Sequence, residues 1–126
     1  MPSKGSRFTG PLEQTAVYWP RPTSDGVGGW TFEAGTEIDV RWSERREQFI
    51  DAEGRERISQ AVVFVGQDVK AGGYLFLGDL DDLASGEEAD PTTIEPDDTH
   101  DRAHEIRAYR KVPDRKAQAW ERKAWL

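Results

Sequence analysis

Cysteine is absent from this 126-residue chain, and long apolar runs are absent as well. Without cysteine there is no disulfide framework, no thiolate metal site and no thiol nucleophile. No apolar stretch approaches the roughly 20 residues that a membrane helix needs. The first residues, Met-Pro-Ser-Lys-Gly-Ser-Arg, lack the apolar core of a signal peptide. These absences predict a soluble protein that is made in the cytoplasm and has no membrane partner.

Hydrophobic residues are also scarce: they make up 36% of the chain, and charged residues make up 33%. The length suits one domain with a single modest core. Part of the chain is therefore expected to lie outside that core. Residues 1–12 are polar and contain two prolines and two glycines, which predicts an extended N-terminal arm. Residues 13–126 are expected to form the single domain.

The net charge of −7 is distributed unevenly along the chain. Residues 1–78 carry 9 basic and 11 acidic side chains, and residues 102–126 carry 8 basic and 3 acidic ones. Residues 79–101 carry 10 acidic side chains and no basic one. Like charges at this density keep a segment solvated, so the sequence predicts a long exposed loop of the kind that is usually functional or disordered. Its acidic residues are Asp79, Asp81, Asp82, Glu87, Glu88, Asp90, Glu95, Asp97, Asp98 and Asp101.

The longest nearly charge-free stretch runs from residue 57 to residue 78, and it contains two β signals. Residues 61–65, Ala-Val-Val-Phe-Val, form an unbroken apolar block that is typical of a strand covered on both faces. Residues 74–77 repeat the signal. Val69 is expected to pack under the loop between them, where Gly72 and Gly73 permit unusual backbone angles. The pattern predicts a β-hairpin at the centre of a small β fold.

Further strands are expected on both sides of this stretch. Residues 14–20 suit a first strand that ends at Pro20, residues 37–42 alternate between polar and apolar, and residues 103–112 regain β character before Pro113. Turns are predicted at 22–29 and 52–54. Trp30 and Trp42 are expected to pack in the core. The last 13 residues are ambiguous, because their propensity favours a helix whereas alternate positions also fit one face of a strand.

No constellation for catalysis or cofactor binding stands out. His100 and His104 are four residues apart, but on a strand that spacing separates them by about 13 Å, and no complete ligand set surrounds them. Ser59 is not part of a nucleophile elbow. Nothing singles out one carboxylate pair for glycosidase chemistry. The sequence therefore predicts no enzyme, no cofactor and no metal.

Eight short segments follow one another in a recognisable order. They are Thr15-Ala-Val-Tyr, Gly35-Thr-Glu-Ile-Asp-Val-Arg-Trp42, Phe49-Ile-Asp-Ala-Glu-Gly-Arg-Glu56, Ser59-Gln-Ala-Val-Val-Phe-Val65, Val69-Lys-Ala-Gly-Gly-Tyr-Leu75, Glu105-Ile106, Lys111-Val-Pro-Asp114 and Arg122-Lys-Ala-Trp-Leu126. The order of these motifs resembles the head-closure proteins of tailed bacteriophages, also called stoppers or head-tail joining proteins. The likeness covers residues 14–126, and its specificity lies in the order and spacing of segments that are individually degenerate. The acidic run is unusually long for this pattern.

The resemblance implies a mainly β fold, a small β-barrel with long loops, whose C-terminal run pairs as a strand. It also implies a homo-oligomeric ring in the virion neck, assembled in the host cytoplasm, with the portal-adaptor proteins on one side and a tail protein on the other. Such a ring retains packaged DNA without reading its sequence, and it implies no enzymatic activity. An acidic wall would repel the duplex and let it slide.

Other roles remain open from the residues alone. A tail-completion or tail-terminator subunit is the nearest rival, followed by a small binding module that uses exposed tryptophans, and then by a hydrolase that uses paired carboxylates. Tryptophan beside arginine is favoured at interfaces. The candidate subunit or partner contacts are therefore Trp125, Arg122, Lys123 and Trp120.

Overall fold

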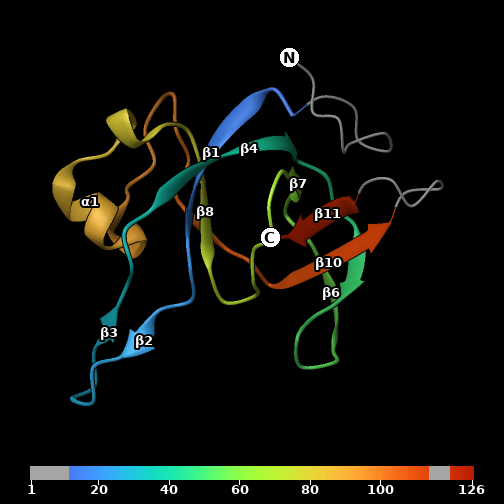
Figure 1. The fold of residues 1–126 in the computed structure, drawn as a ribbon, viewed down its shortest axis with the longest axis horizontal. Helices are drawn as coiled ribbons and strands as arrows, with labels where there is room; N and C mark the ends of the chain where they lie inside the picture. The colour runs from blue at the N-terminus through green and yellow to red at the C-terminus, as the bar shows by residue number, and fades with distance from the viewer. Residues whose placement is uncertain (1–11, 114–119) are drawn as a thin grey trace.

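The computed structural model describes residues 12–113 and 120–126 and shows a mainly β fold (Figure 1). Short helical turns occur only between two of the strands within that part of the chain. The strands are β1 (Gln14–Trp19), β2 (Thr23–Ser24), β3 (Trp30–Thr31), β4 (Thr36–Ser43), β5 (Gln48–Ile50), β6 (Glu56–Ile58), β7 (Val62–Val65), β8 (Tyr74–Leu77), β9 (His104–Glu105), β10 (Ala108–Pro113) and β11 (Trp120–Trp125). The helical turns are η1 (Leu80–Asp82), α1 (Ser85–Ala89) and η2 (Pro91–Thr93).

The main sheet has seven antiparallel strands in the order β10-β11-β7-β4-β1-β8-β9. Its two end strands, β9 and β10, are separated by only two residues of one continuous segment. Ile106 N–H donates to the Gly73 carbonyl at 2.8 Å, and Arg107 N–H donates to the Trp125 carbonyl at 2.8 Å. This segment therefore pairs with β8 at its start and with β11 at its end, which curls the sheet into a barrel-like fold.

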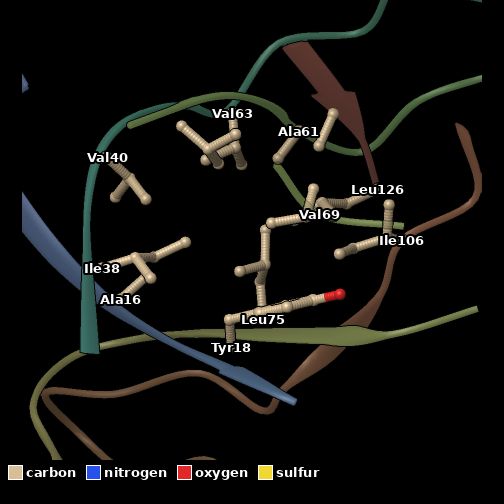
Figure 2. Close-up of a cluster of buried hydrophobic side chains, with 12 residues drawn as sticks. Ala16, Tyr18, Ile38, Val40, Ala61, Val63, Val69, Leu75, Ile106 and Leu126 are labelled. Atoms are coloured by element: carbon tan, nitrogen blue, oxygen red, sulfur yellow. The ribbon is translucent and has the colours of Figure 1, made fainter. Parts of the chain in front are cut away.

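The interior of the curved sheet is filled by apolar side chains from β1, β4, β7, β8, β11 and the segments that adjoin them, and Tyr109 of β10 packs against this cluster (Figure 2). They alternate with outward-facing residues, as a pleated strand requires. On β1, for example, Ala16 and Tyr18 point inward, whereas Val17 and Trp19 belong to a second cluster. The inner cluster consists of Ala16, Tyr18, Ile38, Val40, Ala61, Val63, Val65, Val69, Leu75, Ile106, Ala124 and Leu126.

Most of the predicted strands are confirmed. The alternation in residues 37–42 appears in β4, where Ile38 and Val40 are buried between exposed neighbours. The apolar block at 61–65 forms β7, which is covered on both faces, and Val69 is buried as expected. The C-terminal run forms β11, paired with β10 and β7. Pairing on both edges overrides the helical propensity of its alanine, lysine and glutamate residues.

The predicted hairpin between residues 61–65 and 74–77 is wrong. β7 pairs with β4 and β11, whereas β8 pairs with β1 and β9, so the two strands lie in separate parts of the sheet. The glycines between them have another use. Gly72 has a φ of +92°, and a Cβ on Gly73 would lie 2.6 Å from the Trp19 carbonyl oxygen. They let this connection return closely against β1.

Two small hairpins project from the barrel. β2–β3 turns through residues 25–29, and β5–β6 turns through residues 51–55, as the turn signals predict (Figure 1). Trp30 was expected in the core, but it lies on the first hairpin with 65% of its surface exposed. A two-residue strand far from the sheet offers no partner face for it. Trp42 is half-buried and packs against the inner cluster.

Candidate functional site: two covers on the barrel wall

Residues 79–101, here called the acidic cover, are folded against the barrel. The prediction of a long solvated loop is wrong in this respect, because the segment forms η1, α1 and η2 in succession beside β1 and β8 (Figure 1). The prediction was based on charge density and gave no weight to the few apolar residues between the carboxylates. Its ten acidic side chains do remain outside the core: seven are exposed, and Glu87, Glu88 and Asp90 are half-buried.

Apolar contacts and one long-range hydrogen bond hold the acidic cover in place. Ile94 is buried in the second cluster with Val17, Trp19 and Phe76, and Leu80 and Leu83 pack beside them. The Trp19 indole Nε1 donates to the Glu88 backbone carbonyl at 2.8 Å. Trp19 has no exposed surface. The outer face of β1 is therefore closed by the acidic cover, and the cover is fixed relative to the barrel.

Several of the carboxylates also stabilise the turns that display them. The Asp82 carboxylate accepts from the Asp79 N–H at 2.8 Å, and the Glu87 carboxylate accepts from the Ala84 N–H at 2.8 Å. Asp90 caps η2 by accepting from the Thr92 N–H at 3.0 Å. An ionised acceptor at the start of a helical turn satisfies N–H groups that have no other partner. The acidic sequence is thus compatible with local order.

A hollow of about 590 Å³ lies between the second half of the acidic cover and the end of β8. The His100 ring stacks on Phe76 at 5.6 Å, with its Nε2 3.3 Å from an Asp82 oxygen. Backbone N–H donors from Thr99 and His100 hold the pKa of Asp97 below its ordinary value. Among the carboxylates that line the hollow, Asp97 is therefore favoured in its charged form.

The two histidines do not form a common site. His104 Nε2 lies 3.1 Å from Asp101, whereas His100 faces Asp82 and Asp97. Among residues 12–113 and 120–126, no group of three or more histidine or acidic side chains could hold a metal ion. Ser59 is buried, and its hydroxyl donates to the Arg45 carbonyl at 3.0 Å and accepts from the Glu47 N–H. Its hydrogen bonds order the chain before β5.

The other cover is the β5–β6 hairpin, which closes the outer face of β7 and β11. Phe49 stacks on Trp125 with ring centroids 5.8 Å apart, and Val62 and Ala108 complete a third cluster. Trp125 was expected as a contact with another subunit, but only 8% of its surface is exposed. Its indole donates to the Glu47 carboxylate at 3.1 Å. The side chain belongs to the fold of a single copy, and this corrects its assignment as an interface.

The basic residues expected beside Trp125 are also bound within the chain. Lys123 Nζ lies 2.5 Å from a Glu47 oxygen. Burial would raise the pKa of Glu47, but hydrogen bonds from Lys123 and Trp125 outweigh that effect, so the pKa is lowered. Arg122 Nε and the Tyr109 hydroxyl both donate to the Asp68 carboxylate, each at 2.9 Å. These two hydrogen bonds lower the pKa of Asp68 to about 2.

These ion pairs remove Arg122 and Lys123 from the set of free cations expected at an interface. For Trp120 only the backbone is described, and it pairs with Pro113. Sequence reasoning missed Glu47 and Asp68 because they lie 76 and 54 residues from their partners. No local spacing signals such contacts. Residues 1–11 of the predicted arm lie outside the described residues.

No protein-family model, no curated protein and no solved structure matches the chain. Within the described ranges, 12–113 and 120–126, the structure contains no helix with the length and apolar character to cross a membrane.

Proposed function

We propose that the chain is a structural subunit of the virion neck in a tailed bacteriophage, a head-closure protein that forms a ring between the portal-adaptor complex and the tail. In this role it retains packaged DNA and presents a docking surface for the tail, without catalysis. The motif order in residues 14–126 is the source of the proposal, and a small barrel-like fold is compatible with it.

The acidic cover is the observation that carries the proposal. It places ten carboxylates and no basic side chain in one segment that is fixed to the barrel through Trp19 and Ile94. A mobile chain could move its charges away from passing DNA, whereas a fixed patch maintains its repulsion. A wall of one negative sign neither collects phosphates nor releases counterions, which is the opposite of a DNA-binding surface. The patch therefore suits a channel through which DNA slides.

Assembly on DNA-filled heads tests this proposal. The purified chain is added to tailless heads of the phage that carries its gene. We expect a ring at the portal vertex by electron cryo-microscopy and a smaller fraction of nuclease-accessible DNA. The outcome against the proposal is a chain that leaves the portal vertex bare and the DNA accessible. Neighbouring reading frames give an independent check, since portal, capsid and tail genes are expected there.

Charge neutralisation on the acidic cover tests the role of the patch itself. The triple variant Asp81→Asn, Glu95→Gln, Asp98→Asn is compared with Glu13→Gln, Glu33→Gln, Asp39→Asn, three exposed carboxylates outside the cover. Both variants change the net charge equally. Only the first is expected to slow DNA ejection, with a smaller effect at high ionic strength. Equal ejection rates for the two variants would separate the acidic cover from DNA.

One observation favours a small binding module as the second candidate. Trp30 and Val27 expose 65% and 87% of their surfaces on the same projecting hairpin. Exposed tryptophan is a common contact for peptides and carbohydrates. A binding module would act as a monomer with a soluble ligand, whereas a neck subunit forms a ring. The head-assembly experiment distinguishes the two.

A further inference from the structure

An aromatic groove of about 370 Å³ lies between the β2–β3 hairpin and the acidic cover. Trp30 and Phe32 come from the hairpin side, and Tyr74 comes from β8. Phe32 and Tyr74 contact edge to face, with ring centroids 5.6 Å apart. Trp30 has no such aromatic partner within the described residues and is mostly exposed. The groove is thus an apolar surface that nothing in the described chain covers.

Two carboxylates give this groove its charge. Glu105 pairs directly with Tyr74 across β8 and β9, and Asp90 stands at the start of η2. Burial raises the pKa of Tyr74, and the negative charges of Glu105 and Asp90 raise it further. Arg21 contributes one cation on the side of Gly72. Aromatic faces and carboxylates together attract lysine and arginine side chains, which also pack their apolar stems on the rings.

A segment of this chain has the complementary chemistry. Residues 1–11 carry Lys4, Arg7 and Phe8 and contain no acidic residue. Their charge is opposite to that of Asp90 and Glu105 and of the acidic cover that forms one wall. Phe8 adds an aromatic ring that suits the surface of Trp30. The segment therefore matches the groove in both charge and apolar character.

The geometry favours the segment of a second copy over the chain's own. The Leu12 side chain lies beside Gly66, before the start of β1, whereas Arg21 and the groove follow the end of β1. The near edge of the groove, where Tyr74 pairs with Trp19, is seven residues of extended chain from Leu12, or about 23 Å. Phe8 is four residues from Leu12, and even a fully extended chain carries it only about 14 Å. The Phe8 ring therefore cannot reach the groove of its own copy.

We propose that the groove formed by Trp30, Phe32, Tyr74, Asp90 and Glu105 receives the basic N-terminal segment, residues 1–11, of a neighbouring copy. Because the segment leaves one end of β1 and the groove opens at the other, each contact joins two different surfaces. Contacts of this heterologous kind close into a ring or extend into a filament. The choice of a ring rests on the proposed function, and the contact between two copies does not.

The absence of cysteine allows a direct test by site-specific cross-linking. One preparation carries Phe8→Cys, and another carries Thr92→Cys, at an exposed position on the rim of the groove. The two are mixed under oxidising conditions at the concentration where the wild-type chain self-associates. We expect a Phe8–Thr92 disulfide between copies, identified by mass spectrometry. Its yield should fall when Trp30→Ala is added to the Thr92→Cys chain and remain unchanged with Val27→Ala.

Two controls make the result decisive. Glu53→Cys, at an exposed position on the β5–β6 turn, reports random collisions with Phe8→Cys. A chain carrying both Phe8→Cys and Thr92→Cys reports docking within one copy. Cross-linking no greater than with Glu53→Cys, or cross-linking only within one copy, overturns the inference. If the disulfide forms between copies but the chain does not assemble on phage heads, the contact between copies stands and the neck function is refuted.

Discussion

Trp19 and Trp125 occupy equivalent positions on two different stretches of the barrel wall. Each points outward from a main strand, each is covered by a separate segment, and each donates its indole N–H to a glutamate. Trp19 bonds the backbone carbonyl of Glu88, and Trp125 bonds the carboxylate of Glu47. The two covers therefore use the same device to close the outer faces of the sheet.

The surroundings of the two tryptophans differ in whether their charged side chains are paired within the chain. Around Trp125, Lys123 pairs with Glu47, and Arg122 pairs with Asp68. Around Trp19, Glu88 accepts the hydrogen bond through its backbone carbonyl, so its carboxylate takes no part in the contact. Basic side chains are absent from residues 79–101. The charges around Trp125 are thus compensated within the chain, whereas seven of the ten carboxylates of the acidic cover are exposed. This difference supports the proposal that the acidic cover is the functional surface, whereas the β5–β6 hairpin serves the fold.

The largest effect is expected from removing the anchor of the acidic cover. Trp19→Ala leaves a cavity at a side chain with no exposed surface and removes the bond to Glu88. A loss of about 3–5 kcal/mol in the free energy of unfolding is expected for such a change. Urea denaturation measures it. A loss below about 1 kcal/mol, typical of surface substitutions, would show that the cover does not depend on Trp19.

Trp125→Ala is expected to be nearly as costly, because the ring packs on Phe49 and Val62. We expect a loss of about 3 kcal/mol, whereas Trp30→Ala should change the stability by no more than about 0.5 kcal/mol because that ring is exposed. Both are measured by the same denaturation experiment. Equal, small losses would return Trp125 to the list of interface residues.

The ion pair between Asp68 and Arg122 of β11 predicts a smaller, pH-dependent effect. The Asp68 pKa of about 2 lies below its ordinary 3.8, mainly because Arg122 and then Tyr109 donate to it. Its contribution to stability is therefore complete above pH 3.8 and is lost as the pH falls towards 2. Carboxyl NMR titration should give a midpoint near 2, which Arg122→Gln moves towards 3.8 and Tyr109→Phe moves less. A wild-type midpoint of 3.8 would show that the pair does not form.

The strands could be predicted because their signals are local. The alternation at Ile38 and Val40 and the apolar block at Val62–Val65 are properties of adjacent residues, and burial on one or both faces follows from them. The pairing of β7 with β11 could not be predicted, because every apolar strand offers the same backbone groups. The residues left the C-terminal run open between a helix and a strand, and the resemblance favoured the strand.

The candidate site was half predicted for the same reason. The acidic composition of residues 79–101 correctly placed the carboxylates outside the core. The acidic composition gave no weight to Ile94 or Leu83. Two or three apolar side chains are nevertheless enough to anchor a segment when the folded sheet offers an apolar surface on which they can pack. That wall, formed by Val17, Trp19 and Phe76, exists only after β1 and β8 have paired.

Hydrogen exchange across residues 79–101 tests the central claim most directly, that the acidic cover is held on the barrel with its carboxylates outward. The amides of Glu88, Asp90 and Ile94 donate to the carbonyls of Ala84, Gly86 and Pro91. We expect these amides to be protected in the wild type and less protected in Trp19→Phe, which keeps an apolar ring but loses the indole N–H. Protection in β4 and β7 should be the same in both chains. Exchange at free-peptide rates throughout the wild-type segment would show a solvated loop and contradict the account.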